Sequence, residues 1–275
     1  MTGFDRDAYR ERIGLSGGVT ADVDGLARLH RAQAGAISFE NFDILLGRPI
    51  ELGPEALFDK LVRRRRGGYC FELNGLLNLA LAAFGFEVRP LLARVHLQNP
   101  PSPRTHELLL VSIGGRDWIA DVGFGGMGLR FPMPFELGRA EAQEGDVFRL
   151  TDAGPYGVML EEEGPEGWRA LYSFSLGPVF PADIAMGNFY TSWNPDVFFT
   201  FAKTAARTIP GGRITLIEER LRRIAGAEES FETLEPGPPY LAALEQVFGI
   251  RLDAPYEALM PLRERLGPGA GAADR

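Results

Sequence analysis

The chain has 275 residues, of which 45% are hydrophobic and 24% charged, as in an ordinary globular protein. Its formal net charge of −8 argues against a nucleic-acid partner, because such partners are bound by clustered positive charge. One cysteine cannot form an intrachain disulfide, which is consistent with a reducing compartment. Residues 1–12 lack the apolar core of a signal peptide, and no apolar stretch is long enough to span a membrane. We therefore expect a cytoplasmic protein without a membrane partner.

Hydrophobic periodicity divides the chain into three successive regions. The first is helical, with helices expected over Asp24–Ala36, Pro54–Arg65 and Cys70–Phe84. The second consists of strands, expected over Glu87–Leu97, Glu107–Ile113, Asp117–Val122, Val147–Thr151, Gly157–Glu162 and Ala170–Phe174. The third is mixed, with a helix at Phe198–Arg207, strands at Arg213–Leu216 and Ser230–Glu232, a helix at Pro239–Phe248 and a disordered tail at Gly267–Gly271.

Cys70, the only cysteine, follows Arg66-Gly67-Gly68-Tyr69 at the start of a predicted helix. A thiol in the first turn of a helix lies near the positive end of the helix dipole, so we expect a lowered pKa and a nucleophilic thiolate. The alternative is a buried cysteine that acts only as a small hydrophobic residue. The glycine pair, the glutamate and the asparagine around it favour a functional site.

A base for this thiol must come from three histidines. His30 falls inside an amphipathic helical stretch, where a packing or surface role is expected. His96 lies at the junction of a strand and a loop. His106 opens a buried strand, and this position favours it as the base.

The hairpin that follows His106 brings it next to a carboxylate. If Gly114 and Gly115 form the two-residue turn, Leu108 of the first strand faces Asp121 of the second. His106 and Asp121 then lie diagonally on one face, with Cα atoms roughly 7–8 Å apart, within reach of a hydrogen bond. A thiolate, a base and an orienting carboxylate are the members of a catalytic triad, but spacing alone leaves open whether Cys70 joins the other two.

Several separated motifs resemble those of the arylamine N-acetyltransferase family. The Arg-Gly-Gly-x-Cys motif matches residues 66–70, with Glu72 and Asn74 also in place. The other matches are Phe-Glu-Asn at 39–41, Thr-His at 105–106 and Asp-Val-Gly-Phe-Gly at 121–125. The resemblance extends from residue 7 to residue 249, which is nearly the whole chain.

The resemblance implies an α+β fold with a cysteine-protease-like catalytic core. Its parts would be a helical bundle over 1–84 with the cysteine, a β-barrel over 85–190 with the histidine and aspartate, an interdomain helix region over 191–207, and an α/β lid with the disordered tail over 208–275. By the same resemblance, Cys70, His106 and Asp121 form the catalytic triad.

The resemblance also implies binding and supporting residues. Acceptor contacts would be Phe39, Val95, Phe124 and Phe199; coenzyme A contacts would be Thr105, Gly125 and Gly126; structural supports would be Glu40 and Arg66. The chain departs from one family segment, because Trp193 stands where threonine is usual and Val197 where serine is usual. Two hydroxyls available to the donor are thereby missing.

Three further signals have ordinary explanations. Residues 123–128 fit G-x-G-x-x-G, but the prolines that follow cannot start the helix that a dinucleotide fold requires. The run of arginines at 63–66 is typical of a solvated helix end, apart from Arg66, for which we expect an ion pair with Glu40. Three scattered histidines and one cysteine offer no ligand cluster, so we expect no metal.

The sequence therefore predicts an acyltransferase that uses acetyl-CoA as co-substrate. It would acetylate aromatic amines or hydrazines by a ping-pong mechanism through an acetyl-cysteine. The alternatives are a papain- or transglutaminase-type cysteine hydrolase, an amide synthase that uses the same triad, and a non-enzymatic protein that binds acyl-CoA or scavenges amines.

Overall fold

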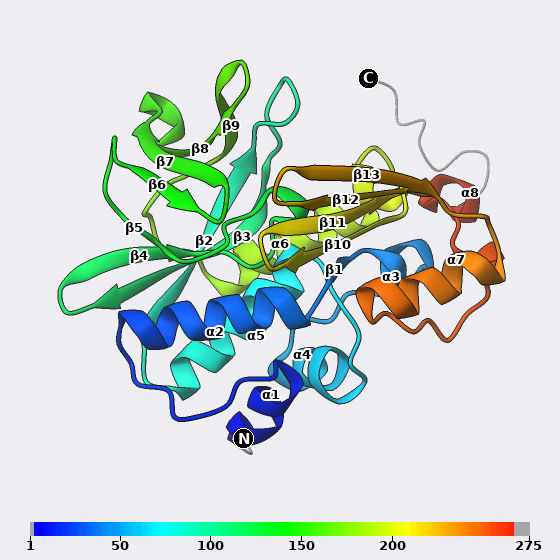
Figure 1. Cartoon of the computed structure of the whole chain (residues 1–275), viewed down its shortest axis with the longest axis horizontal. Helices are drawn as coiled ribbons and strands as arrows, with labels where there is room; N and C mark the ends of the chain where they lie inside the picture. Colours follow the sequence, from blue (N-terminus) through cyan, green and yellow to red (C-terminus); the bar gives the residue numbers. More distant parts are fainter. Residues whose placement is uncertain (1–2, 267–275) are drawn as a thin grey trace.

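The computed structural model describes residues 3–266, and the first part of the chain in it forms a group of helices (Figure 1). These are α1 (Arg6–Arg12), α2 (Val23–Ala36), α3 (Phe42–Leu45), α4 (Pro54–Phe58), a π-helical turn (Asp59–Arg63) and α5 (Cys70–Ala83). Helix α5 contributes a row of fully buried leucines to the core that these helices share. The helical regions predicted around residues 24–36, 54–65 and 70–84 are confirmed.

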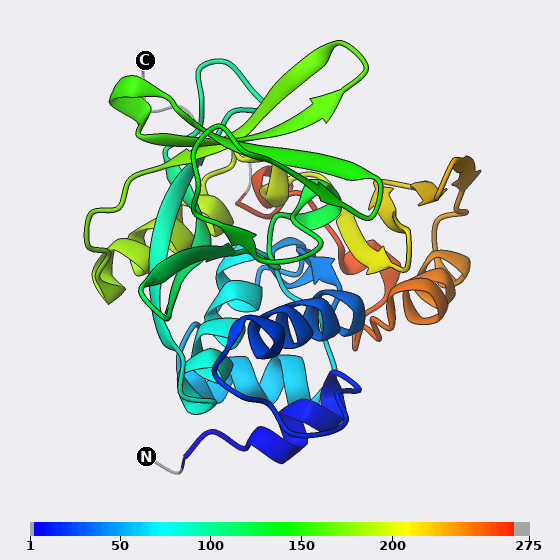
Figure 2. The same cartoon turned by 60° about the vertical axis from the view of Figure 1, so that its left-hand side comes forward.

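Eight antiparallel strands form a strongly curved sheet beside these helices (Figure 2). The strands are β2 (Glu87–Val95), β3 (Arg104–Ile113), β4 (Arg116–Ala120), β5 (Met133–Pro134), β6 (Ala140–Gln143), β7 (Asp146–Asp152), β8 (Val158–Gly164) and β9 (Gly167–Phe174), in the order β5-β4-β3-β2-β9-β8-β7-β6. The side chain of Gln143 in β6 accepts from the amides of Arg130 and Phe131, just before β5, at 2.8 and 3.1 Å. This link between the two end strands makes the sheet a nearly closed barrel.

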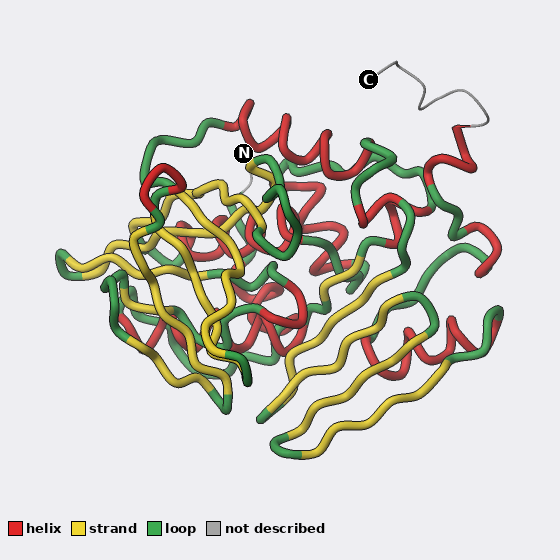
Figure 3. The backbone as a smooth tube through the Cα atoms, turned by 90° about the horizontal axis from the view of Figure 1, so that it is seen from above, coloured by secondary structure: helices red, strands yellow, loops and turns green. Residues whose placement is uncertain are grey.

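A second, five-stranded antiparallel sheet lies beside the barrel (Figure 3). Its strands are β1 (Phe39–Glu40), β10 (Thr204–Ile209), β11 (Gly212–Ile217), β12 (Arg220–Ala225) and β13 (Glu228–Thr233), paired in that order. The remaining helices are α6 (Pro181–Trp193), α7 (Pro238–Ala243), a π-helical turn (Leu244–Phe248) and α8 (Leu262–Leu266). Because β1 comes from the helical part and pairs with β10, the C-terminal sheet is joined directly to the N-terminal helices.

Strand β3 separates two hydrophobic cores. Leu109 and Val111 point into the core of the helices, whereas Leu108 and Leu110 point into the barrel. Both faces are buried, which is why this strand reads as a continuous apolar run in the sequence. The strand therefore carries His106 at the junction of the helices and the barrel. The α+β fold expected from the sequence is confirmed, and the boundaries proposed between its parts stay predictions.

The helix predicted over Phe198–Arg207 is wrong. Only a short 3-10 turn forms at Phe198–Thr200, and β10 begins at Thr204. The cause is tertiary: the Asn41 side chain donates to the carbonyls of Phe199 and Ala202, each at 2.7 Å, and accepts from the amide of Thr204 at 3.0 Å. These bonds hold the segment extended so that it pairs with β1.

Helix α6 and strands β10 and β12 were not expected. Helix α6 exposes large apolar residues such as Met186 and Phe189, so it lacks the usual amphipathic pattern. Its start did carry a signal, since Pro181 stands in the first turn and Asp183 accepts a hydrogen bond from the amide of Phe180. The predicted tail at Gly267–Gly271 lies outside the described residues, among which no helix is long and apolar enough to span a bilayer.

Candidate active site

Two glycines before Cys70 allow neighbouring groups to lie close to the start of its helix. A Cβ at Gly67 would lie 2.4 Å from the carbonyl oxygen of Ser38, and one at Gly68 would lie 2.8 Å from the carboxylate of Glu72. Neither glycine has a positive φ. The Gly-Gly pair is therefore required by close approach and not by a left-handed turn.

A buried charge network surrounds this segment. Arg66 forms two hydrogen bonds with Glu40, at 2.9 and 3.0 Å, which is the ion pair expected from the sequence. Arg66 also reaches Asp43 at 3.2 Å, and Lys60 contacts Asp43 at 2.6 Å and Glu72 at 2.7 Å. Burial would raise the pKa of Asp43, but Lys60 and Arg66 lower it to about 2. Asp43 is therefore ionised at neutral pH.

This network also supports the helix of Cys70. Glu72, in the first turn of α5, accepts a hydrogen bond of 3.0 Å from the amide of Tyr69, immediately before the thiol. Its other carboxylate oxygen binds Lys60. Because the helix start is held from within the core, Cys70 has a defined position.

The hairpin places His106 against Asp121 as the sequence predicts. Gly114 and Gly115 both have positive φ, 58° and 77°, as a type I′ turn requires, and Leu109 pairs with Ala120 in the predicted register. His106 Nε2 lies 2.7 Å from Asp121 Oδ2, and both side chains are almost fully buried.

The second carboxylate oxygen of Asp121 is also occupied. It accepts hydrogen bonds from the Asn74 side chain and from the amide of Gly123, each at 2.9 Å. Burial would raise the pKa of Asp121, but the facing His106 and these donors lower it below its ordinary value. Asp121 is therefore ionised at neutral pH and can hold a proton on Nε2 of His106.

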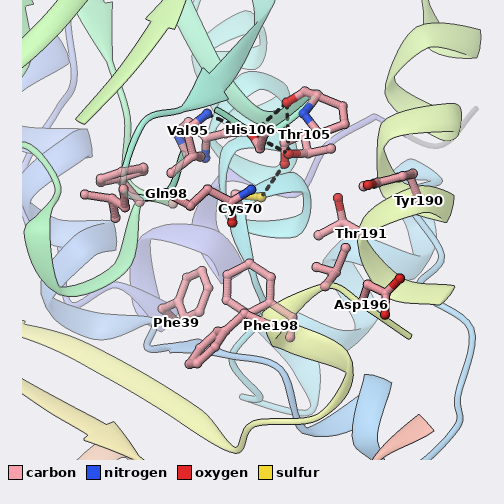
Figure 4. Close-up of a pocket in the computed structure, with 17 residues that line it drawn as sticks. Phe39, Cys70, Val95, Gln98, Thr105, His106, Tyr190, Thr191, Asp196 and Phe198 are labelled. Atoms are coloured by element: carbon pink, nitrogen blue, oxygen red, sulfur yellow. Dashed lines mark hydrogen bonds between the residues drawn. The ribbon is translucent and has the colours of Figure 1, made fainter. Parts of the chain in front are cut away.

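Cys70 and His106 both line one cavity of about 380 Å³ (Figure 4). Cys70 is 3% exposed, and its Sγ lies 3.8 Å from the carbonyl oxygen of Thr105, to which the thiol can donate. The loop after Asp121 packs closely against Cys70: a Cβ at Gly123 would lie 2.8 Å from the Cα of Cys70. The structure thus brings the three expected triad residues together.

The expectation that the helix start lowers the pKa of Cys70 is wrong. Burial raises the pKa of this thiol, and the negative charges of Glu107 and Asp121 raise it further. Backbone hydrogen bonds from Glu107 and Phe71 lower it, but by less. An isolated thiolate is therefore unfavourable here, and deprotonation needs a group that takes the proton and stays nearby as a cation.

All four predicted acceptor residues line this cavity: Phe39, Val95, Phe124 and Phe199. Thr105 also lines it, whereas Gly125 and Gly126 do not. Those two glycines pack against the ring of Phe39 and against Thr215 of the second sheet. The lining residues that were not predicted as site residues are Leu97, Gln98, Ser102, Pro103, Gly123, Tyr190, Thr191, Asp196 and Phe198, with Val197 noted only as a departure.

Three buried residues contact the His106–Asp121 pair; the sequence predicted a site role for none of them, and for His30 only a packing or surface role. Asn74 binds the carboxylate of Asp121, and its place in the Cys70 motif was the available signal. The ring of Tyr172 packs 5.0 Å from that of His106. His30 Nε2 lies 3.0 Å from the carbonyl oxygen of Asp121, and burial lowers the pKa of His30 to about 4, so it is neutral.

Comparison with known proteins identifies the family. A family model described as N-acetyltransferase matches residues 22–256. The arylamine N-acetyltransferase / N-hydroxyarylamine O-acetyltransferase of Salmonella typhimurium is 40% identical over 91% of this chain and 90% of that protein, and the arylamine N-acetyltransferase of Mycolicibacterium smegmatis is 37% identical over 90% and 93%.

Solved structures agree with this match. The Salmonella typhimurium enzyme superposes with a TM-score of 0.86 at 38% identity, over 89% of this chain and 90% of that one. The Mycobacterium marinum enzyme in complex with CoA superposes with a TM-score of 0.85 at 36% identity, over 90% and 93%. The chain therefore belongs to the arylamine N-acetyltransferase family, whose members are acyltransferases that transfer acetyl groups to arylamines.

Proposed function

We propose that this protein acetylates arylamines and arylhydrazines with acetyl-CoA, by a ping-pong mechanism through an acetyl group on Cys70. The observation that carries the proposal is that Cys70 and His106, which is hydrogen-bonded to Asp121, line one cavity together with several aromatic side chains. A thiol, a base and an orienting carboxylate are the groups that acyl transfer through a covalent intermediate needs.

In the first half-reaction, the thiol proton passes to His106. Because Nε2 is held by Asp121, Nδ1 is the ring nitrogen that takes it. Proton transfer creates a thiolate and an imidazolium together, so the net charge of the buried site does not change and the cost of an isolated thiolate is avoided. The sulfur attacks the thioester carbonyl, the bond from carbon to the coenzyme A sulfur breaks, and coenzyme A leaves with the proton from His106.

In the second half-reaction, the amine nitrogen attacks the acetyl-cysteine carbonyl. The bond between carbon and Sγ breaks, and the amine gives up one proton through His106, which restores the thiol. Aromatic amines suit this step because they are largely unprotonated at neutral pH. The four aromatic and aliphatic side chains Phe39, Val95, Phe124 and Phe199 support binding of an aromatic acceptor beside the sulfur.

Donor binding is proposed on two grounds. The structure of the Mycobacterium marinum relative contains CoA, and in this protein Thr105 lines the cavity next to His106. Gly125 and Gly126, with half-buried backbone outside the cavity, are proposed to contact the longer part of the donor. Glu40 and Arg66 are proposed to support the segment that precedes Cys70.

Mass spectrometry of the intact protein after mixing with acetyl-CoA, without amine, tests the proposal. We expect one acetyl group per chain, located on Cys70, its loss when an arylamine is added, and no adduct in Cys70→Ser. An adduct elsewhere, or none in the parent, would contradict it. Release of coenzyme A in proportion to acetylated amine distinguishes a transferase from a cysteine hydrolase, which would consume acetyl-CoA without any amine.

A further inference from the structure

A second cavity lies where α1, α2, β10 and the turn after β6 meet. Its volume is about 470 Å³, and none of the described residues that line it lines the cavity around Cys70. Five arginines line it: Arg12, Arg31, Arg65, Arg130 and Arg207. So dense a group of positive charges is unexpected in a chain with a net charge of −8.

Carboxylates neutralise only two of these arginines. Arg31 pairs with Glu144 at 2.5 Å, and Arg130 pairs with Asp146 at 2.7 Å. The other three are Arg12, Arg65 and Arg207, and they form no ion pair within residues 3–266. The cavity therefore holds positive charge that the described part of the protein does not balance with carboxylates.

Backbone carbonyls hold two of the three in place. Arg12, which is 8% exposed, donates to the carbonyls of Leu61 and Ala36, both at 2.8 Å, and Arg207 donates to that of Gly35 at 3.0 Å. These carbonyls belong to the end of α2 and to the π-helical turn, and a helix end carries only about half a negative charge. Burial, together with repulsion from the neighbouring arginines, lowers the pKa of Arg12 to about 10, so it stays charged at neutral pH.

Arg65 differs from the other two. It is exposed, its φ is +54°, and its side chain forms no hydrogen bond within the described residues. A long side chain rarely adopts this left-handed conformation, and such strained positions often accompany a ligand site. All five donors of its guanidinium are therefore available to a bound group.

We propose that this second cavity binds a small molecule that carries phosphate groups, between Arg12, Arg65 and Arg207. Guanidinium groups match the geometry of phosphate oxygens and bind them in pairs. Because Arg12 and Arg207 are already held by the backbone, little side-chain ordering accompanies binding. Glu11 also lines the cavity and opposes the anion. The proposal is independent of the acetyl-transfer function.

Calorimetric titration with inorganic diphosphate at constant ionic strength tests the site. We expect saturable binding to the parent protein and binding at least about tenfold weaker to Arg65→Gln, which loses charge-assisted hydrogen bonds. Glu11→Gln should bind more tightly, because it removes an opposing charge. Arg64→Gln is the matched control: Arg64 is the neighbouring exposed arginine, pairs with Asp59 at 2.7 Å and does not line the cavity.

Several outcomes would overturn the proposal. They are no saturable binding to the parent, equal affinity of Arg65→Gln and Arg64→Gln, or citrate bound as tightly as diphosphate, which would remove the assignment to phosphate. Since the Arg65 side chain is exposed and forms no hydrogen bond or ion pair within the described residues, Arg65→Gln should fold, and circular dichroism checks this. A rise of the melting temperature with diphosphate, present in Arg64→Gln and absent in Arg65→Gln, provides a second measurement.

Discussion

Asn74 donates a hydrogen bond of 2.9 Å to the carboxylate of Asp121 from the second turn of the helix that begins with Cys70. Its amide nitrogen also donates to the carbonyl of Glu107 at 2.6 Å, and its oxygen accepts from the amide of Val122 at 3.0 Å. One side chain thus joins the helix of the thiol to both strands of the hairpin that carries the proposed base and its orienter.

Replacing Asn74 by alanine should disturb this alignment. The carboxylate of Asp121 and the amide of Val122 would each lose a buried partner, so we expect kcat/KM for an arylamine to fall by about 10- to 100-fold, with a lower melting temperature. Asn78→Ala is the control on the same helix, because the Asn78 side chain has no hydrogen bond among the described residues. Equal activity of the two variants would contradict a positioning role for Asn74.

Asp121→Asn should leave the shape of the site intact and change the tautomer of His106. Two donors, Asn74 and the amide of Gly123, face one side of the residue and would select the oxygen of the new carboxamide. Its NH₂ group would then point at Nε2 of His106 and force the proton onto Nδ1, where it blocks transfer from the thiol. A loss of up to about 10⁴-fold in kcat is expected, as in serine triads. A folded variant, checked by circular dichroism, that acetylates at the parent rate would exclude this role of Asp121.

The pH dependence of thiol alkylation separates the effect of burial from that of His106. Burial raises the pKa of Cys70, so in His106→Ala the reaction with iodoacetamide should titrate above the value of about 8.5 for a free thiol. In the parent, the imidazolium stabilises the thiolate, and alkylation should titrate at lower pH. Identical titrations in both proteins would show that His106 does not take the thiol proton.

His30 should make the fold sensitive to acid. Its pKa is about 4 in the folded protein and about 6.5 when unfolded, so the unfolded state binds more protons and stability falls as pH decreases through this window. Between pH 7.5 and 5.5 this amounts to about 1.3 kcal/mol. Urea unfolding at both values should show this loss in the parent and not in His30→Gln. Substitution of the half-buried His96 should leave most of the loss in place.

Local chemistry explains what the sequence could predict. The Gly114-Gly115 turn sets the register of the hairpin, and from that register the contact between His106 and Asp121 follows without knowledge of the rest of the fold. The pair Arg66–Glu40 was accessible because both residues stand in recognisable motifs.

Long-range contacts explain what it could not predict. Asn41 controls residues 199–204 through hydrogen bonds that span about 160 positions of the chain, and nothing in the local pattern of residues 198–207 reveals them. The pKa of Cys70 was mispredicted for the same reason, because burial comes from segments distant in sequence and outweighs the helix start. Predictions from local periodicity are least reliable where contacts with distant parts of the chain determine the conformation.

The two departures from the family segment at residues 193 and 197 should have different effects. Val197 lines the cavity with Cys70, whereas Trp193 does not. A hydroxyl introduced by Val197→Ser would enter the cavity, where one hydrogen bond to the donor is worth roughly 1 kcal/mol, so we expect the KM for acetyl-CoA to fall by about fivefold. Trp193→Thr should leave this KM within about twofold of the parent. Steady-state kinetics with the donor varied at a saturating arylamine distinguish the two, and an improvement in Trp193→Thr alone would mean that the donor passes over α6 and not along residue 197.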